Sequence, residues 1–336
     1  MKFNIKYFEL AMVFWFFAVC VQINAQTIIA TNKPTPQKTY SIEWIGKYPT
    51  GKSHSKNWLT NFLFGSKNLP EITKPNAIIA TDSTSFLVLD QGSGTIFYVK
   101  NNEKKIPKIL KKNKKTFPSL ISFCKLPDND ILFTDSRLNK IYRMNDKLKT
   151  LGVFNDSLSL HQPTGIAYSV NTKEIWVVET AAHRISIINE QGKLIKTIGK
   201  KGTQPGEFNY PTNIWIANNG NVYVVDALNF RIQVFDKKGS VISVFGEIGD
   251  ATGYFARPKG IATDSYGNIY ICDALFNTVQ VFDIAGNFLY QFGEQGRGNG
   301  QFWMPTGIYI DSHDIIYVAD SYNARIQLFK RKEEKY

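Results

Sequence analysis

The sequence predicts an all-β fold, a six-bladed β-propeller in which each blade is a four-stranded antiparallel sheet. The first observation is a unit that recurs six times at intervals of 43 to 48 residues and opens with a proline before a short apolar run. The second is an acidic residue that ends the next apolar run in every copy. The prolines are Pro75, Pro118, Pro163, Pro211, Pro258 and Pro305. The acidic residues are Asp90, Asp135, Glu179, Asp226, Asp273 and Asp320. A repeat of this length in an all-β pattern is typical of propellers and solenoids.

The fifth copy shows how one unit becomes a blade. Residues 261–263 and 269–272 are apolar runs separated by a Tyr-Gly-Asn turn, because Gly and Asn tolerate a positive φ. Residues 278–282 form a third apolar run, and residues 288–292 alternate like a half-exposed edge strand. One sheet cannot cover both of its faces, so consecutive sheets are expected to stack around an axis.

The two ends of the repeat region predict how the ring closes. Only three strands follow Pro305, whereas one unpartnered strand at residues 41–46 precedes Pro75. We therefore expect the N-terminal strand to complete the last blade. The predicted organisation is a signal peptide at 1–25, a linker at 26–40, the propeller at 41–331 with an inserted segment at 49–74, and a charged tail at 332–336.

The N-terminus predicts export. Lys2 and Lys6 precede an apolar stretch at 10–21, and Ala25 offers a small residue for cleavage, which is the pattern of a secretory signal. The stretch is short for a membrane span, so contact with a membrane is expected only if the segment stays uncleaved. The mature protein is expected to be secreted or periplasmic, in the cell envelope.

The two cysteines outside this segment, Cys124 and Cys272, fall in the second and fifth copies. A six-bladed ring places them on nearly opposite sides, farther apart than a disulfide allows. Both are expected to be small buried hydrophobic residues.

Four motifs of the repeat resemble the NHL-repeat family of six-bladed β-propellers. They are a Pro-x-Gly-Ile opening, a second strand of the form apolar-Tyr-Val-x-Asp, an Asn-x-Arg-Ile-Gln-Val-Phe third strand and a Gly-x-Phe linker. The resemblance covers residues 40 to 330 and is clear in the last three copies and degenerate in the first three. It implies a secreted or periplasmic scaffold, while function must be argued from a site.

The acidic residues that end the second strands recur together with arginines at Arg184, Arg231 and Arg325. In a propeller these groups lie on the same face, around the central channel. One interpretation is a charged ring that binds a partner, with the arginines as its contacts. The favoured interpretation is a repeated structural bond between carboxylate and arginine or backbone in each blade.

The family that the chain resembles includes amidating lyases, whose zinc-binding histidines directly follow the opening proline. Here those positions hold Asn76, Ser119, Thr164, Thr212, Lys259 and Thr306. The sequence therefore disfavours an open zinc site of three histidines. It also lacks a Gly-x-Ser-x-Gly nucleophile motif. Calcium held by backbone carbonyls in the channel stays open, since backbone ligands leave no sequence pattern.

Positive charge is concentrated in one segment. The formal net charge is +12, and residues 100–115 hold eight lysines and one glutamate. Lys111, Lys112, Lys114 and Lys115 lie in a predicted linker on the channel-mouth face and are candidates to bind a partner such as an anionic polymer. Nucleic acid is disfavoured, because export is expected and no stacking aromatic residues alternate with these lysines. A solvated loop is the alternative.

The linker before the first copy departs from the repeat. It spans 29 residues from Gly46 to Pro75, against 12 in the three regular linkers. Trp58 and Phe62 belong to an apolar pattern typical of a short amphipathic helix. It predicts either a flap that covers the closure of the ring or a segment that docks a partner.

Two functional hypotheses follow. The first is a non-catalytic secreted propeller that binds a protein or envelope partner through its loop face. The second is a lyase or hydrolase that works in the central channel, with calcium.

Overall fold

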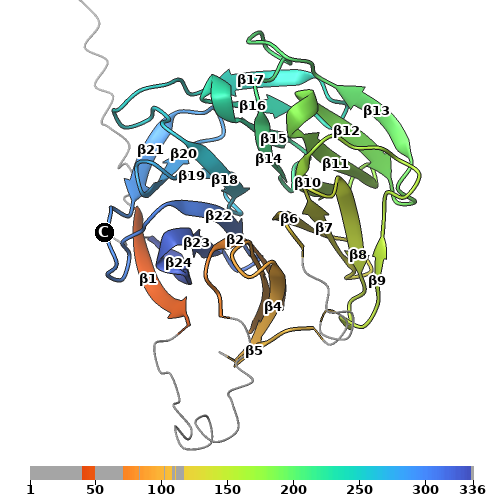
Figure 1. Ribbon diagram of the computed structural model, residues 1–336. Coiled ribbons are helices and arrows are strands. Elements are labelled where there is room, and N and C mark those ends of the chain that lie inside the picture. The colour runs from red at the N-terminus through yellow and green to blue at the C-terminus, as the bar shows by residue number, and fades with distance from the viewer. Residues whose placement is uncertain are drawn as a thin grey trace, which may run out of the picture. The chain divides into compact units, whose positions relative to one another are not determined.

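The computed structural model describes residues 40–49, 71–82, 84–101, 103–107, 110 and 117–333. Residues Tyr40–Lys332 form one compact unit of six four-stranded antiparallel sheets. Figure 1 shows the sheets arranged as blades around a central axis, with one strand of each blade innermost. Among the described residues, no helix has the length and apolar character needed to cross a membrane.

The strands of the first three blades follow one another from the axis outward. Blade 1 contains β2 (Pro75–Asp82), β3 (Ser85–Asp90), β4 (Thr95–Lys100) and β5 (Glu103–Lys105). Blade 2 contains β6 (Leu120–Lys125), β7 (Ile131–Asp135), β8 (Lys140–Met144) and β9 (Leu151–Val153). Blade 3 contains β10 (Pro163–Ser169), β11 (Glu174–Glu179), β12 (Arg184–Asn189) and β13 (Leu194–Ile198).

The next three blades keep this order, and short 3-10 turns follow the second strand of blades 3, 4 and 6. Blade 4 contains β14 (Pro211–Ile216), β15 (Val222–Asp226), β16 (Arg231–Phe235) and β17 (Val241–Phe245). Blade 5 contains β18 (Pro258–Thr263), β19 (Ile269–Asp273), β20 (Thr278–Phe282) and β21 (Phe288–Phe292). Blade 6 contains β22 (Pro305–Ile310), β23 (Ile315–Asp320), β24 (Arg325–Glu333) and β1 (Tyr40–Tyr48). The turns are η1 (Thr180–Ala182), η2 (Ala227–Asn229) and η3 (Ser321–Asn323).

The predicted closure of the ring is confirmed, because β1 pairs with β24 as the outer strand of blade 6. Trp44 Nε1 donates a hydrogen bond of 3.0 Å to Gln327 Oε1 across this junction. The last strand, β24, runs to Glu333, two residues past the predicted end of the propeller at 331. Lys332 forms an ion pair of 2.7 Å with Glu43 of β1, which ties its charge to the sheet.

The anchor proline and the acidic residue keep a constant spacing because they are paired across adjacent antiparallel strands. Pro75 pairs with Asp90, and Pro305 pairs with Asp320. In blade 2 this pairing overturns the predicted anchor, since Leu120 rather than Pro118 pairs with Asp135. Pro118 precedes the strand by two residues, so the residue that follows the true anchor is Ile121, not Ser119.

The Pro-x-Gly motif exists because the blades approach one another closely at the start of their inner strands. A Cβ atom on Gly260 would lie 2.5 Å from the carbonyl oxygen of Thr306, and one on Gly307 would lie 2.2 Å from that of Asn76. The neighbouring backbone cannot yield as a flexible side chain would, so glycine is required. The sheet register is also irregular just after Pro258 and Pro305.

The core lies between the blades, as the repeat predicts. Trp176, Tyr223 and Tyr270 are fully buried in the second strands of their blades. Cys124 and Cys272 are buried free thiols, as expected. Burial raises the pKa of both thiols, which keeps them protonated and poorly nucleophilic.

Candidate functional site

One side of the ring, which we call the loop face, carries the linkers between blades and the hairpins between second and third strands. Hydrogen bonds join these two kinds of loop. In blade 6 the Tyr322 amide donates to the Trp303 carbonyl at 3.0 Å, and in blade 4 the Leu228 amide donates to that of Asn209 at 3.0 Å. The predicted coincidence of linkers, carboxylates and arginines on one face is therefore observed.

The six blade-end carboxylates hold the linkers in place. All six residues are 0% exposed, namely Asp90, Asp135, Glu179, Asp226, Asp273 and Asp320. Each accepts a backbone N–H from the incoming linker. The Asn209 amide donates to Asp226 Oδ1 at 2.7 Å, and the Trp303 amide donates to Asp320 Oδ1 at 2.7 Å. A buried carboxylate that accepts such bonds contributes to folding rather than to binding.

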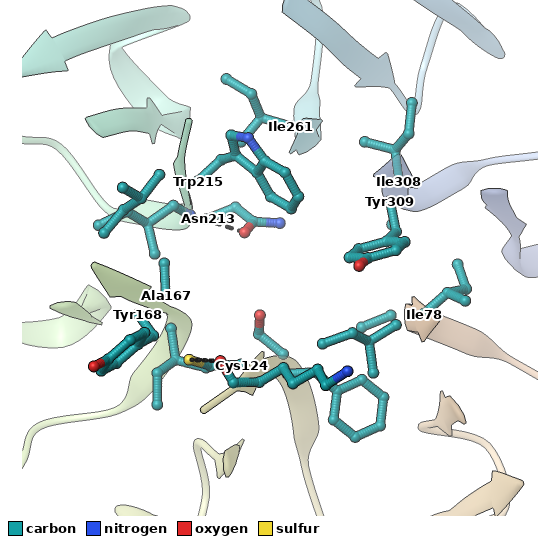
Figure 2. Close-up of a pocket in the computed structure, with 18 of the residues that line it drawn as sticks. Ile78, Cys124, Ala167, Tyr168, Asn213, Trp215, Ile261, Ile308 and Tyr309 are labelled. Atoms are coloured by element: carbon teal, nitrogen blue, oxygen red, sulfur yellow. Dashed lines mark hydrogen bonds between the residues drawn. The ribbon is translucent and has the colours of Figure 1, made fainter. Parts of the chain in front are cut away.

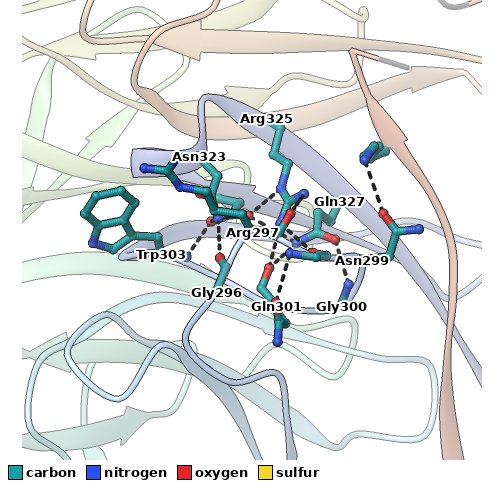
Figure 3. A network of polar contacts seen from close by, with 12 residues as sticks. Gly296, Arg297, Asn299, Gly300, Gln301, Trp303, Asn323, Arg325 and Gln327 are labelled. Atoms are coloured by element: carbon teal, nitrogen blue, oxygen red, sulfur yellow. Dashed lines mark hydrogen bonds and ion pairs between the residues drawn. The ribbon is translucent and has the colours of Figure 1, made fainter. Parts of the chain in front are cut away.

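The arginine of blade 6 belongs to the same structural network (Figure 3). Arg325 Nε donates to Asp320 Oδ2 at 2.6 Å. Its two terminal nitrogens donate to the carbonyl oxygens of Arg297, Gly298 and Gln301 at 2.8 Å each. Gln327 completes the clamp, accepting from the Gly300 amide at 3.0 Å and donating to the Gln301 carbonyl at 2.6 Å.

Blade 4 repeats this clamp and blade 3 keeps only part of it. Arg231 Nε donates to Asp226 Oδ2 at 2.8 Å, and its side chain is 12% exposed. Arg184 bonds Glu179 alone, at 2.9 Å, and its side chain is 34% exposed. The structure thus uses the three predicted arginines as internal donors, and we do not include them in the binding surface proposed below.

Blade 5 has no arginine at this position, where Thr278 stands. Asp273 is instead held by four backbone amides, those of Ala256, Arg257, Leu275 and Phe276, at 2.8 to 3.4 Å. Burial raises the pKa of Asp273, and these amides oppose the rise. The carboxylate stays structural, with no cationic side chain to compensate it.

A cavity of about 340 Å³ opens at the centre of the loop face. We call it the cup. Most of its lining comes from the residues before and after each anchor and, in blades 1, 2, 3 and 5, from the residue after the blade-end carboxylate; Asn213 and Tyr322 complete it. With Leu120 as the anchor of blade 2, eleven of the twelve residues that flank the anchors line it. The six residues that follow the anchors, where the resemblance to amidating lyases would place zinc ligands, all line this cavity, and none of them is histidine.

The charged groups that line the cup are all cationic. They are Lys74 from the linker before blade 1, and Arg257 and Lys259 on either side of Pro258 in blade 5. Within the part of the chain that the structure describes, no Asp or Glu lines it. Burial, followed by the nearby charges of Arg257 and Lys74, lowers the pKa of Lys259. The charges of Arg257 and Lys74 therefore act on Lys259, and we call these three residues the cation triad.

A second cavity of about 180 Å³ lies deeper along the axis, and we call it the bore (Figure 2). Asn213 lines both the cup and the bore, so the two adjoin. Ile78, Trp215 and Tyr309 project into the bore in Figure 2, and Trp215 Nε1 is bonded to Thr263 Oγ1 at 2.9 Å. Burial raises the pKa of Tyr309 to about 12, so it stays a neutral phenol. The bore is thus lined by aliphatic and aromatic side chains together with the polar Asn76, Ser122, Asn213 and the cationic Lys125.

Exposed apolar side chains occur on the loop face in blades 4 to 6, close in the chain to residues that line the cup. Tyr322 and Leu275 at the hairpin tips are 52% and 54% exposed, and Trp303 and Tyr210 at the linker ends are 36% and 43% exposed. Lys74 lies over the Tyr322 ring at 5.3 Å, and Arg297 lies over the Trp303 ring at 5.2 Å. Exposed aromatic rings beside cations are typical of binding surfaces.

Two histidines, His161 and His183, lie on the loops of blade 3. Among the described residues no group of three or more His, Cys, Asp and Glu side chains could hold a metal ion. His183 Nδ1 accepts a hydrogen bond of 3.1 Å from the Tyr210 amide and its ring packs on that tyrosine at 4.5 Å. His161 is exposed on the linker into blade 3.

Several predicted partner-binding residues lie outside the described part of the chain. They are Trp58, Phe62, Lys111, Lys112, Lys114 and Lys115. The signal peptide at 1–25 and most of the inserted segment at 49–74 lie outside it too. These assignments stay predictions.

Sequence reasoning missed the cation triad. Its one signal was that cations occupy the positions beside the anchor in the copies beginning at Pro75 and Pro258. In the sequence, Lys259 stands out only as a residue other than histidine at the position after the opening proline. The fold gives the signal its meaning, because it brings Lys74 and Lys259 to the same cavity across blade 6.

Comparison with known proteins supports the architecture. A family model described as a 6-bladed beta-propeller matches residues 153–242 and 261–332, just under half of the chain. No curated protein sequence matches significantly.

Solved structures resemble the chain over most of its length. A protein of unknown function from Bacteroides thetaiotaomicron has a TM-score of 0.64 at 14% identity and covers 88% of this chain and 76% of its own. An auxiliary nutrient binding protein from Bacteroides ovatus has a TM-score of 0.61 at 14% identity and covers 88% and 78%. Virginiamycin B lyase from Staphylococcus aureus has a TM-score of 0.56 at 16% identity and covers 87% and 99%. At these identities the likeness shows the fold alone, and the chain is a six-bladed β-propeller.

Proposed function

We propose that this chain is a secreted or periplasmic, non-catalytic propeller of the NHL-repeat type that binds a protein or envelope partner through its loop face. The observation that carries the proposal is the set of exposed aromatic and leucine side chains around the cup. Tyr210, Leu275, Trp303 and Tyr322 come from four different loops of blades 4 to 6; Tyr322 lines the cavity, and the others stand one or two residues along the chain from residues that line it. Surface residues of this kind, gathered around a concavity, favour recognition.

The carboxylates and arginines that recur in the repeat do not compete with this function. The carboxylates and arginines of blades 4 and 6 are saturated by internal hydrogen bonds, so mutation of the rim leaves them intact. Proteins of the same fold include one described as an auxiliary nutrient binding protein, which also favours binding.

A lyase or hydrolase working in the channel, with calcium, is the second candidate. The structural likeness to virginiamycin B lyase and the presence of a central cavity favour it. However, no described His, Asp or Glu lines the cup or the bore, so an acid–base pair would have to come from elsewhere. Stoichiometric calcium or zinc in purified protein would move the assignment to this candidate.

Capture and identification of the partner tests the first candidate. The purified propeller is cross-linked to the envelope fraction of the producing cells, and the bound proteins are identified by mass spectrometry. A Trp303→Ala, Tyr322→Ala double variant should lose the partner, whereas Ile195→Ala and Leu289→Ala should retain it. These controls remove similarly exposed apolar side chains (48% and 44%) from outer strands. Equal capture by all three proteins would refute the proposal, and fractionation of tagged protein tests its location.

A further inference from the structure

The cup has the electrostatic character of an anion site. Its three charged side chains are Lys74, Arg257 and Lys259, and within the described residues no ion pair joins any of them to a carboxylate. Lys259 is half-buried, whereas Lys74 and Arg257 reach solvent at the rim. A concave cavity lined by charge of one sign concentrates counter-ions of the other sign.

The nearest carboxylates cannot supply that counter-charge at the surface of the cup. Asp90 accepts the Thr73 and Lys74 amides at 3.1 and 2.6 Å, and Asp273 accepts the Arg257 amide at 3.0 Å. Both are 0% exposed, and neither lines the cavity. Asp90 and Asp273 therefore partly offset the positive potential of the cation triad from beneath the cup, and the surface of the cavity stays cationic.

Neutral donors complete the site. Thr164 and Thr180 share a hydrogen bond of 2.7 Å, and the Thr180 hydroxyl donates to the Pro211 carbonyl, so these hydroxyls are used between blades. Thr212 occupies the equivalent position in blade 4 and lines the cup, and its hydroxyl oxygen is buried with no hydrogen-bond partner among the described residues. A buried polar group without a partner calls for an explanation such as an ordered water or a bound ligand.

We propose that the cup binds an oxyanion group, a carboxylate, sulfate or phosphate, of a small polar ligand, with Lys74, Arg257 and Lys259 pairing with its oxygens and Thr212 donating a hydrogen bond. The size fits, because a cavity of about 340 Å³ lies at the lower end of the range for small-molecule sites. The proposal rests on the proposed binding function and names the chemistry that the centre of the loop face recognises.

Calorimetric titration of the purified full chain tests it. The probes are inorganic phosphate, inorganic sulfate and glucuronate, each at constant ionic strength with chloride as the exchanged ion. At least one probe should bind saturably with one site per chain. The three probes also separate the sources, since a preference for glucuronate points to an acidic sugar and a preference for phosphate or sulfate to an ester. Lys259→Gln and Arg257→Gln should each weaken binding at least tenfold.

Lys193→Gln is the matched control, because Lys193 is exposed in the hairpin between the third and fourth strands of blade 3, away from the loop face. It should change affinity less than twofold, and circular dichroism should show all variants folded. Absence of saturable binding by every probe, or equal loss in Lys193→Gln and Lys259→Gln, would overturn the inference. Partner capture that still depends on Trp303 and Tyr322 would then leave the broader function standing.

Discussion

Arg325 could either stabilise the fold or contact a partner, and replacing it by threonine distinguishes these two roles. Blade 5 carries Thr278 at the same position, so the substitution gives blade 6 a side chain that the fold already accommodates elsewhere. If Arg325 serves the structure, the change lowers stability. If it serves a partner, the change leaves stability intact and abolishes binding.

The magnitude follows from the contacts that are lost. The Arg325 side chain is 9% exposed and makes an ion pair with Asp320 and three bonds to linker carbonyls. Removing one partner of a buried ion pair costs about 3–5 kcal/mol. Asp320 keeps the donors of Trp303, Asn323 and Gln327, which favours the lower half of that range. With an unfolding entropy of about 0.6 kcal/mol/K for a unit of this size, the melting temperature should fall by roughly 5–7 °C.

Urea unfolding followed by tryptophan fluorescence measures the loss, with the slope of the transition as a check that the denatured state is unchanged. Arg184→Thr is the comparison, because Arg184 bonds only Glu179 and is one-third exposed. It should lose about half as much or less. A loss of under about 1 kcal/mol for Arg325→Thr, at an unchanged slope, would refute the structural interpretation.

Three further predictions concern the blade contacts, the cup and the ring closure. Gly307→Ala should lower the free energy of unfolding by about 1–3 kcal/mol, because the added Cβ would meet the Asn76 carbonyl. Gly152→Ala is the control, because a Cβ there has nothing within 4 Å, and it should change the free energy of unfolding by less than about 0.5 kcal/mol. If urea unfolding gave similar losses of stability for both variants, the close approach of the blades at Gly307 would be contradicted. Lys259→Gln should raise the melting temperature of the ligand-free protein at pH 7. Its lowered folded-state pKa means that the wild type gains stability as pH rises through that pKa towards the unfolded value of about 10.4, and the variant should lack this gain in pH-dependent melting. Deleting Tyr40–Tyr48 should expose the edge of β24 and cause association detectable by light scattering; a monomeric, equally stable product would show that the strand is dispensable.

The fold could be predicted from the sequence because its markers report local geometry that every blade repeats. The anchor proline and the blade-end carboxylate are cross-strand neighbours, as Pro305 and Asp320 show, so their spacing is fixed by one hairpin. The closure followed from counting strands. Blade 2 was misread because Leu120 occupies the anchor position without being proline, and Pro118 stands close enough to be mistaken for it.

The cup could not be predicted, for a physical reason. Lys74 precedes blade 1 and Lys259 belongs to blade 5, so the two residues are far apart in the chain. Only closure of the ring through blade 6 brings them to one cavity. Neither residue belongs to a recognisable motif. The predicted arginines, by contrast, were visible because they repeat, and they repeat because the linker geometry of blades 4 and 6 is the same.

This contrast indicates where function can reside in such a protein. A residue that recurs from blade to blade serves a structural need that the blades share. The carboxylates, and Gln233 and Gln327 in blades 4 and 6, accordingly form hydrogen bonds with the linkers of their own blades. Recognition of a single ligand on the axis needs asymmetry, which the repeat alone cannot give. The residues flanking the anchors are the positions where the blades differ while facing a common cavity, from Ile121 in blade 2 to Lys259 in blade 5. Changing these residues should therefore alter what the propeller binds while leaving its clamps, and hence its fold, unaffected.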